Sequence, residues 1–545
     1  MPAYTIDASG ESVDFSSSCD QRLMDLTRCV VTADQMQAVE ARVFEAGMPV
    51  AALMDKVGGL IARRIQQLYP KAGYNRVGVL VGPGHNGGDA LVVARELTEA
   101  GYDVIRCEPF QSHKELTTAH RRYGDHLAIA VTAAVADLHD CELVVDGLFG
   151  FGLARPIEGA IAQIIDQVNE WDIPVVSIDL PSGIDTDTGQ VLGTAIRATR
   201  TLCLGLWKRG LLQDHALDYS GEAELIDFGL PQADIQAVLG AVPCHQRITS
   251  TSALEAFPLP RPQSTHKYRE GHLLLVCGSR TYAGAAILAG LAARSSGVGM
   301  LSIAVPKSLA ERLVSLIPDA LVIGCDETNG GAIAHLPEML SLDTYDAIAC
   351  GPGMTLQATD VIHQLLSCPC PLVIDADGLN CLASQQSILL LTRRTTTTVL
   401  TPHPGEFKRL FPDLASEMGD RLRVAQAAAQ QSTSTILLKG ARTVIAFPDG
   451  RVRVNPNSTA ALARGGSGDV LTGILGGLMA QAAARGHSVD AVIPSAVWWH
   501  AQGAIAAAQD NTELGVDAST LITYLKPTLN KHVRASSIAT LQISS

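Results

Sequence analysis

The chain has 545 residues, 41 of them basic and 55 acidic, and a formal net charge of -14. This length exceeds one ordinary domain and predicts two to four domains, at roughly 100–200 residues each. The acidic balance argues against nucleic acid or another polyanion as a partner, although a local basic pocket can still hold a phosphate.

The composition also bears on location. Hydrophobic residues make up 47% of the chain, and the 12 cysteines are scattered without a C-x-x-C pair. This usage predicts free thiols in a reducing cytosol rather than a zinc site or a disulfide framework. The acidic N-terminus does not resemble a signal peptide, and no apolar run approaches the roughly 18–20 residues of a membrane span. We therefore expect a cytoplasmic protein without a membrane partner.

The first 240 residues alternate between apolar strands and amphipathic helices. Residues 1–28 are polar and patternless and predict a loose extension, and apolar positions recur at helical spacing over 32–68. The strands that follow are predicted at 76–82, 102–107, 142–146, 174–179 and 199–205, with helices at 89–99, 114–128 and 159–170. This alternation predicts a Rossmann-like parallel sheet, covered on both faces, over residues 29–240.

A proline-rich stretch without regular pattern separates this region from a second α/β series. We place the boundary near residue 245, with a linker over 241–264 and a second domain over 265–535. Its strands are predicted at 272–277, 300–305, 320–323, 346–350, 372–375, 397–401, 435–438, 443–447 and 451–454. A glycine-rich turn at 465–468 then leads into alanine-rich helices that run to about residue 510. No sequence repeat relates the two halves, which predicts two different α/β domains.

The glycine turn after the first strand raises the possibility of a dehydrogenase. Gly82, Gly84 and Gly87 have the G-x-G-x-x-G spacing of dinucleotide-binding folds. Such a fold also needs an acidic residue at the end of its second strand to hold a ribose. Asp103 lies at the start of that strand and Glu108 just after it, so neither is well placed. A simple tight turn remains an equal alternative.

Polar residues follow three of the predicted strands in this half. Asn86 lies in the glycine turn, Asp146 ends a strand, and Asp179 ends the next one shortly before Ser182. Because parallel strands open at one edge, these side chains would converge there. Each of them alone is more often a capping or turn residue. Three such strand ends in one domain favour a binding site.

Four stretches of this half resemble one family. "TADQMQAVEARVFEAGMPVAALM", "GPGHNGGDALVVAR", "DGLFGFGLARPIEG" and "IDLPSGID" are similar to the YjeF N-terminal family, the NAD(P)H-hydrate epimerases, over roughly 30–230. The resemblance implies potassium at Asn86, Asp146 and Ser182. It implies contacts with the hydrated nucleotide at His85, Asn86, Gly87, Gly88, Asp89, Gly150, Phe151, Gly152, Leu153, Ala154, Arg155, Pro156 and Asp179. Asp179 is then the candidate for proton transfer near C6 of the hydrated ring.

The strongest local pattern lies in the second half. Gly465, Gly466, Ser467 and Gly468 precede an apolar helix that carries Asp469 in its first turn. Free amides and the helix dipole at such a turn form an anion hole, and a neighbouring carboxylate can take a proton from a hydroxyl. The alternative is that Asp469 only caps the helix. No Walker-type phosphate loop is present.

The glycine turn followed by an aspartate is similar to that of ribokinase-like enzymes, and five further stretches point to one family among them. The segment 266–300 and the motifs "CGPGM", "VIDADGLN", "LTPHPGEFKRL" and "LLKGARTVIAFPDG" resemble the ADP-dependent NAD(P)H-hydrate dehydratases over about 265–510. The resemblance implies substrate contacts at Ala285, Gly353, His403 and Asp469, and nucleotide contacts at Lys439, Gly440, Ala441, Arg442, Thr443 and Gly468. Asp375 and Asp377 could position magnesium, but helix capping is an equal alternative for both.

Together the two resemblances predict a bifunctional repair enzyme with potassium, magnesium and ADP as its cofactors and co-substrate. It would epimerise hydrated NADH and NADPH and then dehydrate the S epimer, releasing AMP and phosphate; we also expect a homo-oligomer. One alternative makes the second half an ATP-dependent small-molecule kinase. Another makes the first half a binding module without catalysis.

Overall fold

The structure is a computed structural model that describes residues 22, 26–384 and 388–543. The predicted extension 1–28 therefore lies largely outside the described residues. The chain divides into two compact units, Met1–His245 and Gln246–Ser545, called here the N-terminal and C-terminal units. Among the residues that the structure describes, no helix combines the length and the apolar character that a membrane crossing requires.

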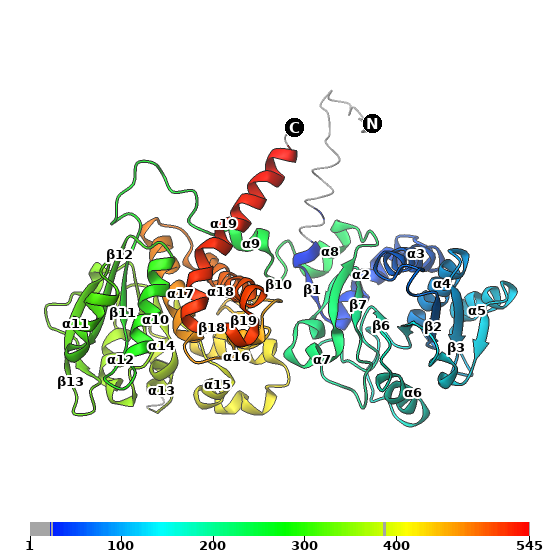
Figure 1. The fold of residues 1–545 in the computed structure, drawn as a ribbon, viewed down its shortest axis with the longest axis horizontal. Helices are drawn as coiled ribbons and strands as arrows, with labels where there is room; N and C mark the ends of the chain where they lie inside the picture. The colour runs from blue at the N-terminus through cyan, green and yellow to red at the C-terminus, as the bar shows by residue number, and fades with distance from the viewer. Residues whose placement is uncertain (1–21, 23–25, 385–387, 544–545) are drawn as a thin grey trace. The chain divides into compact units, whose positions relative to one another are not determined.

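The N-terminal unit is built on a seven-stranded parallel sheet (Figure 1). Its strands, in spatial order, are β4 (Ala130–Thr132), β3 (Asp103–Cys107), β2 (Arg76–Val81), β5 (Leu143–Gly147), β6 (Val175–Ile178), β7 (Arg200–Leu204) and β9 (Glu222–Ile226). A separate two-stranded sheet pairs β1 (Val30–Val31) with β8 (Trp207–Lys208). The helices are α2 (Ala33–Glu45), α3 (Val50–Leu68), α4 (His85–Glu99), α5 (Glu115–His126), α6 (Gly159–Asn169), α7 (Leu217–Ser220) and α8 (Gln232–Leu239).

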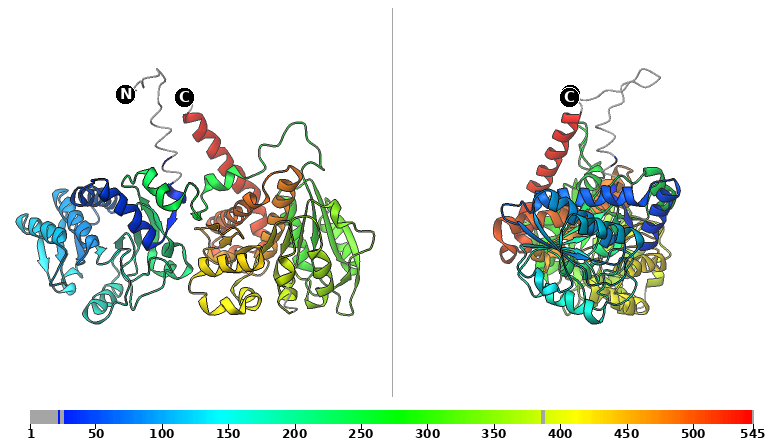
Figure 2. Two further views of the ribbon diagram at one scale, coloured as in Figure 1. Left: turned by 180° about the vertical axis from the view of Figure 1, so that it is seen from behind. Right: turned by 90° about the vertical axis from the view of Figure 1, so that its right-hand side faces the viewer.

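Alternation along the strands explains why helices cover both faces of this sheet. In β2, Val77, Val79 and Val81 belong to a core formed with α2, α3 and α4, whereas Leu80 belongs to a second core formed with α6. Successive strand residues point to opposite faces, so a strand that is apolar throughout needs cover on both sides. The right-hand view of Figure 2 shows the twisted sheet between these two sets of helices.

The C-terminal unit contains an eleven-stranded, mostly parallel sheet. Its strands, in spatial order, are β10 (His245–Arg247), β20 (Val452–Val454), β19 (Val444–Ala446), β18 (Thr435–Leu438), β17 (Thr398–Leu400), β16 (Leu372–Ile374), β15 (Ala347–Cys350), β11 (His272–Val276), β12 (Met300–Pro306), β13 (Leu321–Glu327) and β14 (Ile333–His335). The helices are α9 (Ser250–Glu255), α10 (Ala283–Ser295), α11 (Lys307–Leu316), α12 (Thr359–Leu366), α13 (Ala376–Ser384), α14 (Ile388–Leu391), α15 (Pro404–Leu410), α16 (Arg421–Ser432), α17 (Ser467–Ala484), α18 (Val489–Asn511) and α19 (Ala518–Ile543).

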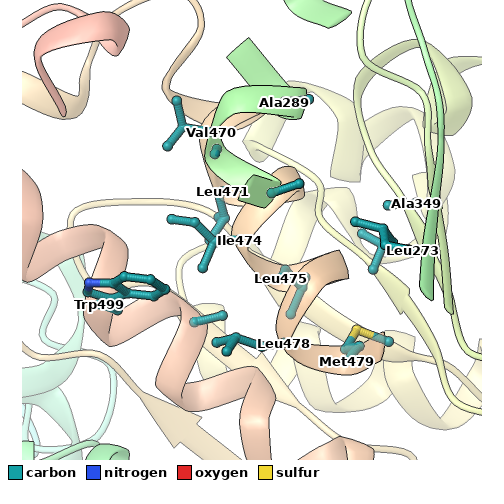
Figure 3. Close-up of a cluster of buried hydrophobic side chains, with 14 of the residues drawn as sticks. Leu273, Ala289, Ala349, Val470, Leu471, Ile474, Leu475, Leu478, Met479 and Trp499 are labelled. Carbon is teal, nitrogen blue, oxygen red and sulfur yellow. The ribbon is translucent and has the colours of Figure 1, made fainter. Parts of the chain in front are cut away.

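Glycines in α17 allow this helix to pack closely on two neighbours. A Cβ on Gly473 would lie 2.2 Å from the Ala289 carbonyl oxygen of α10, and one on Gly476 would lie 3.0 Å from the Ala349 Cβ in β15. Close approach of this kind requires glycine despite its cost inside a helix. Figure 3 shows the resulting core, in which the side chains of α17 lie between Trp499 of α18 and the sheet residue Leu273. The tight packing fixes the position of the helix that begins at the second glycine turn.

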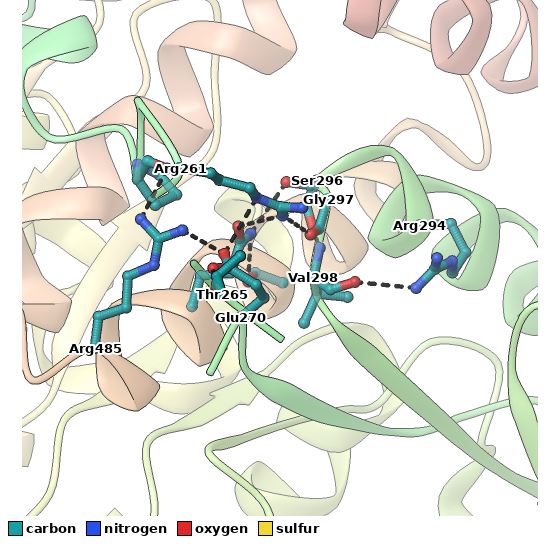
Figure 4. Close-up of polar contacts among 11 residues, drawn as sticks. Arg261, Thr265, Glu270, Arg294, Ser296, Gly297, Val298 and Arg485 are labelled. Carbon is teal, nitrogen blue, oxygen red and sulfur yellow. Dashed lines mark hydrogen bonds and ion pairs between the residues drawn. The ribbon is translucent and has the colours of Figure 1, made fainter. Parts of the chain in front are cut away.

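Part of the predicted linker is structured, since residues 241–264 contain β10 and α9. Just beyond it, a polar network fastens the chain to the C-terminal unit (Figure 4). The buried Glu270 carboxylate accepts a hydrogen bond from Thr265 Oγ1 at 2.5 Å and forms ion pairs with Arg261 and Arg485. Arg261 also donates to the Gly297 carbonyl oxygen. A buried carboxylate with this many donors is fully compensated, which favours one fixed path for the segment.

The observed strands match the predicted ones except at the margins of the sheets. Every predicted strand corresponds to an observed strand, although the one predicted at 320–323 continues to Glu327. The four strands of the two large sheets that were not predicted are β4, β9, β10 and β14, and all four are edge strands. Edge strands are short and half-exposed and therefore lack a continuous apolar run. α4 begins at His85, four residues before the predicted start.

Candidate active sites

The first site begins at the glycine turn between β2 and α4. A Cβ on Gly82 would lie 1.8 Å from the Leu148 carbonyl oxygen, and one on Gly87 would lie 1.9 Å from the Gly82 carbonyl oxygen. Both positions therefore need glycine because backbones meet there. Gly84 is the N-cap residue of α4, so His85 and the residues after it form the first turns of a helix. The unpaired amides of such turns favour an anion.

Asp146 and Ser182 are brought together at the carboxyl edge of the sheet. The fully buried Asp146 carboxylate accepts hydrogen bonds from Ser182 Oγ at 2.6 Å, Ser182 N at 2.9 Å, Ser177 Oγ at 2.7 Å and Leu148 N at 3.2 Å. Burial raises the pKa of Asp146, and these donors partly oppose the rise. The contacts hold the loops after β5 and β6 against each other.

Asp179 forms a buried ion pair with Lys208, a residue that the sequence did not single out. The Asp179 carboxylate also accepts hydrogen bonds from Leu204 N at 3.2 Å and Phe151 N at 3.3 Å. The Lys208 side chain is fully buried; burial lowers its pKa, but the charges of Asp179, Cys203 and Glu40 and the hydrogen bond to Asp179 together raise it. Asp179 has a φ of 69°, a strained value for a residue with a side chain. Strain of this kind is concentrated at functional sites.

A cavity of about 840 Å³ lies between the glycine turn and the Asp179–Lys208 pair and is lined by both. Its lining includes ten of the predicted substrate contacts, namely His85, Asn86, Asp89, Gly150, Phe151, Gly152, Leu153, Ala154, Arg155 and Asp179. The predicted contacts Gly87, Gly88 and Pro156 are absent from the lining, as are Asp146 and Ser182. The cavity is also lined by Glu40, Lys114 and Lys208, which the sequence did not predict. Its size suits a dinucleotide-sized ligand.

Two further carboxyl groups in this cavity have no hydrogen-bond partner among the described residues. Burial raises the pKa of Glu40 to about 7; Lys208 lowers it and Asp179 adds to the rise. Burial also raises the pKa of Asp89 well above its usual range, with further contributions from Asp179 and Glu40. The cavity therefore contains two carboxyl groups whose pKa burial raises, beside a paired carboxylate.

The residues predicted to bind potassium offer oxygen atoms, the type of ligand that this ion prefers. Asn86, Asp146 and Ser182 offer amide, carboxylate and hydroxyl oxygens, which hard cations prefer. The Asn86 amide nitrogen is buried without a partner, and turning the amide would place its oxygen there instead. Asp146 and Ser182 already contact each other directly. No set of three or more His, Cys, Asp or Glu side chains suited to a metal occurs among the described residues.

The second site lies at the glycine turn before α17. Gly466 has a φ of 92° and is the N-cap residue of the helix, which begins at Ser467. Ser467 Oγ donates to the carbonyl oxygens of Leu462 at 2.8 Å and Arg464 at 3.0 Å. His500 Nε2 lies 2.9 Å from the Ser467 carbonyl oxygen, so this nitrogen carries the ring proton. These bonds fix the turn whose amides were predicted as an anion hole.

Asp469 lies in the first turn of α17, half-buried and without a hydrogen-bond partner among the described residues. Burial raises its pKa to about 7; the charge of Asp375 adds to the rise and Lys439 opposes it. A cap would bond to the helix backbone, and Asp469 does not. The carboxyl group is thus available for proton transfer near neutral pH.

A buried ion pair underlies this turn. The Asp375 carboxylate accepts hydrogen bonds from Lys439 Nζ, Thr401 Oγ1 and Thr472 Oγ1, each at 2.7 Å. Burial alone would raise the pKa of Asp375, but Lys439 and the hydroxyls lower it. A Cβ on Gly468 would lie 3.5 Å from Lys439 Nζ. The Lys439 ammonium therefore lies directly beneath the turn.

The aspartates predicted for magnesium do not fit such a site. Both oxygens of Asp375 are occupied by the three donors of the ion-pair network. Asp377 accepts a hydrogen bond from Thr355 N at 2.9 Å and thereby holds the glycine-rich segment of the "CGPGM" motif. Magnesium needs free carboxylate oxygens or phosphates, and this pair does not present them together.

The predicted substrate contacts Ala285 and Gly353 lie next to each other. A Cβ on Gly353, which has a φ of 65°, would lie 3.0 Å from the Ala285 Cβ. His403 caps α15, and its Nδ1 accepts a hydrogen bond from Gly405 N at 2.9 Å, which leaves the ring proton on Nε2. Burial, Lys439 and Arg409 lower the pKa of His403. It is therefore a neutral hydrogen-bond donor at neutral pH.

The predicted nucleotide contacts after Lys439 form a turn. Thr443 Oγ1 donates to the Gly440 carbonyl oxygen at 3.0 Å, and Arg442 donates to the Pro456 carbonyl oxygen. Two members of this group, Lys439 and Gly468, lie next to each other, since a Cβ on Gly468 would be 3.5 Å from Lys439 Nζ. Ala441 has an exposed side chain in the same turn.

Three residues of the two sites were not predicted from the sequence: Glu40, Lys208 and His500. Glu40 lies within the first family-like stretch but was not singled out there, and Lys208 and His500 lie outside all of the quoted motifs. All three are charged or polar residues at positions where the surrounding apolar pattern predicts a buried side chain. Buried groups of this type are compensated or functional, so the mismatch is a usable signal.

Comparisons with known proteins place each half of the chain in a family. The family model described as "YjeF-related protein N-terminus" matches residues 50–210, and the model described as "NAD(P)H-hydrate dehydratase" matches residues 273–527. Bifunctional NAD(P)H-hydrate repair enzymes Nnr match most of the chain. The one from a Synechocystis strain is 52% identical over 92% of this chain and 94% of its own. The one from Thermosynechococcus vestitus is 50% identical over 93% of this chain and 98% of its own.

Among solved structures, the chain is similar to the ADP/ATP-dependent NAD(P)H-hydrate dehydratase of Bacillus subtilis, co-crystallised with ATP and Mg²⁺. The identity is 31% over 52% of this chain and 97% of that one, with a TM-score of 0.44. The predicted fold class, a Rossmann-like N-terminal sheet and a ribokinase-like C-terminal unit, is confirmed by the parallel topology together with the two family models. The chain belongs to the family of bifunctional NAD(P)H-hydrate repair enzymes.

Proposed function

We propose that the chain repairs NADH and NADPH whose nicotinamide ring has gained a water molecule. The N-terminal unit interconverts the two epimers of the hydrate at ring carbon C6. The C-terminal unit removes the water from the S epimer, with ADP as the phosphate donor. The observation that carries the proposal is Asp469, an unpaired carboxyl of raised pKa in the first turn of a helix whose amides can hold a phosphoryl group.

The N-terminal cavity supports proton transfer at C6. The hydroxyl of the hydrate is attached to the carbon next to the ring nitrogen N1. Its loss as water, with formation of a double bond between N1 and C6, makes C6 planar, and water can then add to either face. Asp179 lies in the cavity and exchanges the proton, while Lys208 balances its charge. Potassium held by Asn86, Asp146 and Ser182 would supply a fixed positive charge at the same strand ends.

The C-terminal site supports phosphorylation of the same hydroxyl. Hydroxide is a poor leaving group, and phosphate is a good one. Asp469 takes the proton of the hydroxyl while the β-phosphoryl group of ADP is transferred to its oxygen, which releases AMP. Phosphate then leaves C6 and a proton leaves C5, which restores the dihydropyridine. Amides at Gly468 and its neighbours, together with Lys439, favour the transferring phosphoryl group.

The presence of both activities in one chain is explained by the chirality of the hydrate at C6. A pocket built from L-amino acids binds one epimer at C6 in the geometry needed for phosphoryl transfer. Without the N-terminal activity the other epimer would persist, apart from its slow uncatalysed interconversion. An epimerase in the same chain routes both epimers into dehydration.

The proposal is tested with purified full-length protein and a mixture of both NADPH hydrate epimers. Each epimer is followed by chromatography, and the reduced nicotinamide by its near-ultraviolet absorbance, with ADP and ATP compared. We expect ADP to restore the absorbance completely, with one AMP and one phosphate formed for each NADPH. The S epimer should fall first, and the R epimer should follow faster than in buffer alone.

Two outcomes would contradict the proposal. A stable phosphorylated product with ATP, and no recovery of NADPH, would favour the small-molecule kinase. An R epimer that decays only at the uncatalysed rate would leave the N-terminal unit as a binding module. The variants Asp179→Asn and Asp469→Asn serve as reciprocal controls, since each should remove one activity and retain the other.

A further inference from the structure

The epimerase cavity contains a carboxyl group that lies in the first family-like stretch but was not among the predicted site residues. Glu40 lies on α2 and lines the cavity together with Asp179 and Lys208. On the same helix, Met36, Val39 and Val43 are buried in the core. Glu40 lies outside the range 50–210 that the family model matches.

The short sheet at the start of the unit links Glu40 to Lys208. Val31 of β1 pairs with Lys208 of β8, and Thr32 then caps α2 through a capping box. The segment that positions the lysine is therefore continuous with the helix that carries Glu40. A shift of this segment would move both side chains together.

The two carboxyl groups have opposite surroundings. Three donors, Lys208 Nζ, Leu204 N and Phe151 N, converge on Asp179, so its oxygens act as acceptors. Glu40 receives no hydrogen bond from any described residue and shares the lining of the cavity with apolar residues such as Phe44 and Leu53. Donors favour the ionised form of a carboxyl group, and apolar surroundings favour its acid form. Pairs of this kind divide acid and base roles in many enzymes.

The charges around Glu40 set when it carries a proton. Lys208 of β8, Asp179 after β6 and Asp89 of α4 face it electrostatically, and His85, Lys114 and Arg155 line the rest of the cavity. Burial outweighs Lys208 and raises the pKa of Glu40 to about 7. Glu40 can therefore both hold and release a proton near neutral pH. A general acid is most effective when its pKa lies near the working pH.

We propose that Glu40 is a second catalytic residue of epimerisation, one that donates a proton to the C6 hydroxyl while Asp179 accepts a proton from the water that adds. The C6–O bond breaks, one water leaves, and the N1 electron pair forms the double bond to C6. A second water adds to the other face and passes its proton to Asp179. Return of one proton from Asp179 to Glu40 through solvent restores the site. The inference rests on the proposed epimerase function.

The test compares Glu40→Gln with Glu45→Gln, which changes an exposed glutamate on the same helix. We expect Glu40→Gln to lower kcat for epimerisation by about 10²- to 10⁴-fold with little change in KM. Glu45→Gln should match the wild type. In the wild type kcat, corrected for the uncatalysed rate, should fall as the pH rises through about 7. Glu40→Asp should retain this fall at a lower rate, and Glu40→Gln should lose it.

Dehydration of pure S epimer in the same samples reports on the fold of the full chain and should be unchanged. Epimerisation by Glu40→Gln within threefold of wild type would overturn the proposal, as would a pH profile that Asp89→Asn abolishes and Glu40→Gln retains. If Glu40→Gln cannot be obtained folded, an unaltered rate and pH profile in Glu40→Asp would overturn it. Absence of epimerisation in the wild type would instead refute the proposed function.

Discussion

The two sites use a similar set of groups in different ways. Each has a glycine turn at the start of a helix, a buried Lys–Asp pair and an unpaired carboxyl whose pKa is raised to about 7. In the N-terminal unit the pair Lys208–Asp179 lines the cavity itself. In the C-terminal unit the pair Lys439–Asp375 lies beneath the glycine turn, at Gly468. The unpaired Asp469 belongs to the first turn of the helix that follows.

This difference separates the chemical role of an ion pair from its supporting role. A paired carboxylate that lines a cavity, as Asp179 does, can act on a substrate, whereas one buried beneath a turn, as Asp375 is, can only tune its neighbours. In both sites the charge of the paired aspartate helps to raise the pKa of the unpaired carboxyl. The paired aspartate therefore influences the protonation of the unpaired carboxyl even where it is itself buried beneath the turn.

The largest effect is expected at Asp469, because the proposed mechanism has it both orient the hydroxyl and remove its proton. Asp469→Asn should lower dehydration by about 10⁴-fold, at the upper end for general bases, and leave epimerisation unchanged. Since the active form is the carboxylate, wild-type dehydration should rise as the pH rises through about 7. Recovery of NADPH absorbance from S epimer measures this. Asp413→Asn, on an exposed residue of the same unit, is the control, and near-normal dehydration by Asp469→Asn would make Asp469 a structural residue.

Asp179→Asn tests the other half of the comparison. The amide cannot accept a proton and leaves Lys208 buried without its counter-charge, so epimerisation should fall by about 10²- to 10³-fold. Dehydration of pure S epimer should persist, because that site is in the other unit. Chromatography of the separated epimers measures the first effect. Persistence of epimerisation would mean that the Lys208–Asp179 pair has only a supporting role.

Lys439→Met tests the supporting pair. Removal of one partner leaves the Asp375 carboxylate uncompensated and should lower the free energy of unfolding by about 3–5 kcal/mol. The double variant Lys439→Met/Asp375→Asn should recover much of this loss, because no unpaired charge remains. Urea titration of the three proteins measures the difference. Equal stability of single and double variants would show that the pair is not the source of the loss.

The smallest effect is expected at His500, which supports the anion turn from behind. Burial lowers its pKa to about 4, so it acts as a neutral donor to the Ser467 carbonyl oxygen. His500→Phe retains an aromatic ring and removes this donor, at a cost of roughly 1–2 kcal/mol. The KM for ADP should then rise about tenfold. His487→Phe, at an exposed position, should leave it unchanged, and an equal effect of both would exclude a specific role for His500.

Sequence periodicity located the interior strands well because parallel strands buried on both faces are apolar throughout, as in β2 and β11. It missed the four edge strands, which have no such run. The start of α4 was placed late because the glycines after His85 suggest a loop. Position 87 needs glycine because any Cβ there would collide with the Gly82 carbonyl oxygen, and that close approach exists only in the folded unit.

The sequence alone determined the two α/β units and the two glycine turns, and it singled out Asp179 and Asp469 as candidates, because local patterns and the family resemblance both depend on residues close together in the chain. Only the tertiary structure decided which remote groups join them. Lys208 reaches Asp179 through the β1–β8 pairing, and His500 reaches Ser467 through the packing of α18 on α17. Charge and burial act through space, so their effect on a carboxyl group cannot be inferred from its neighbours along the chain.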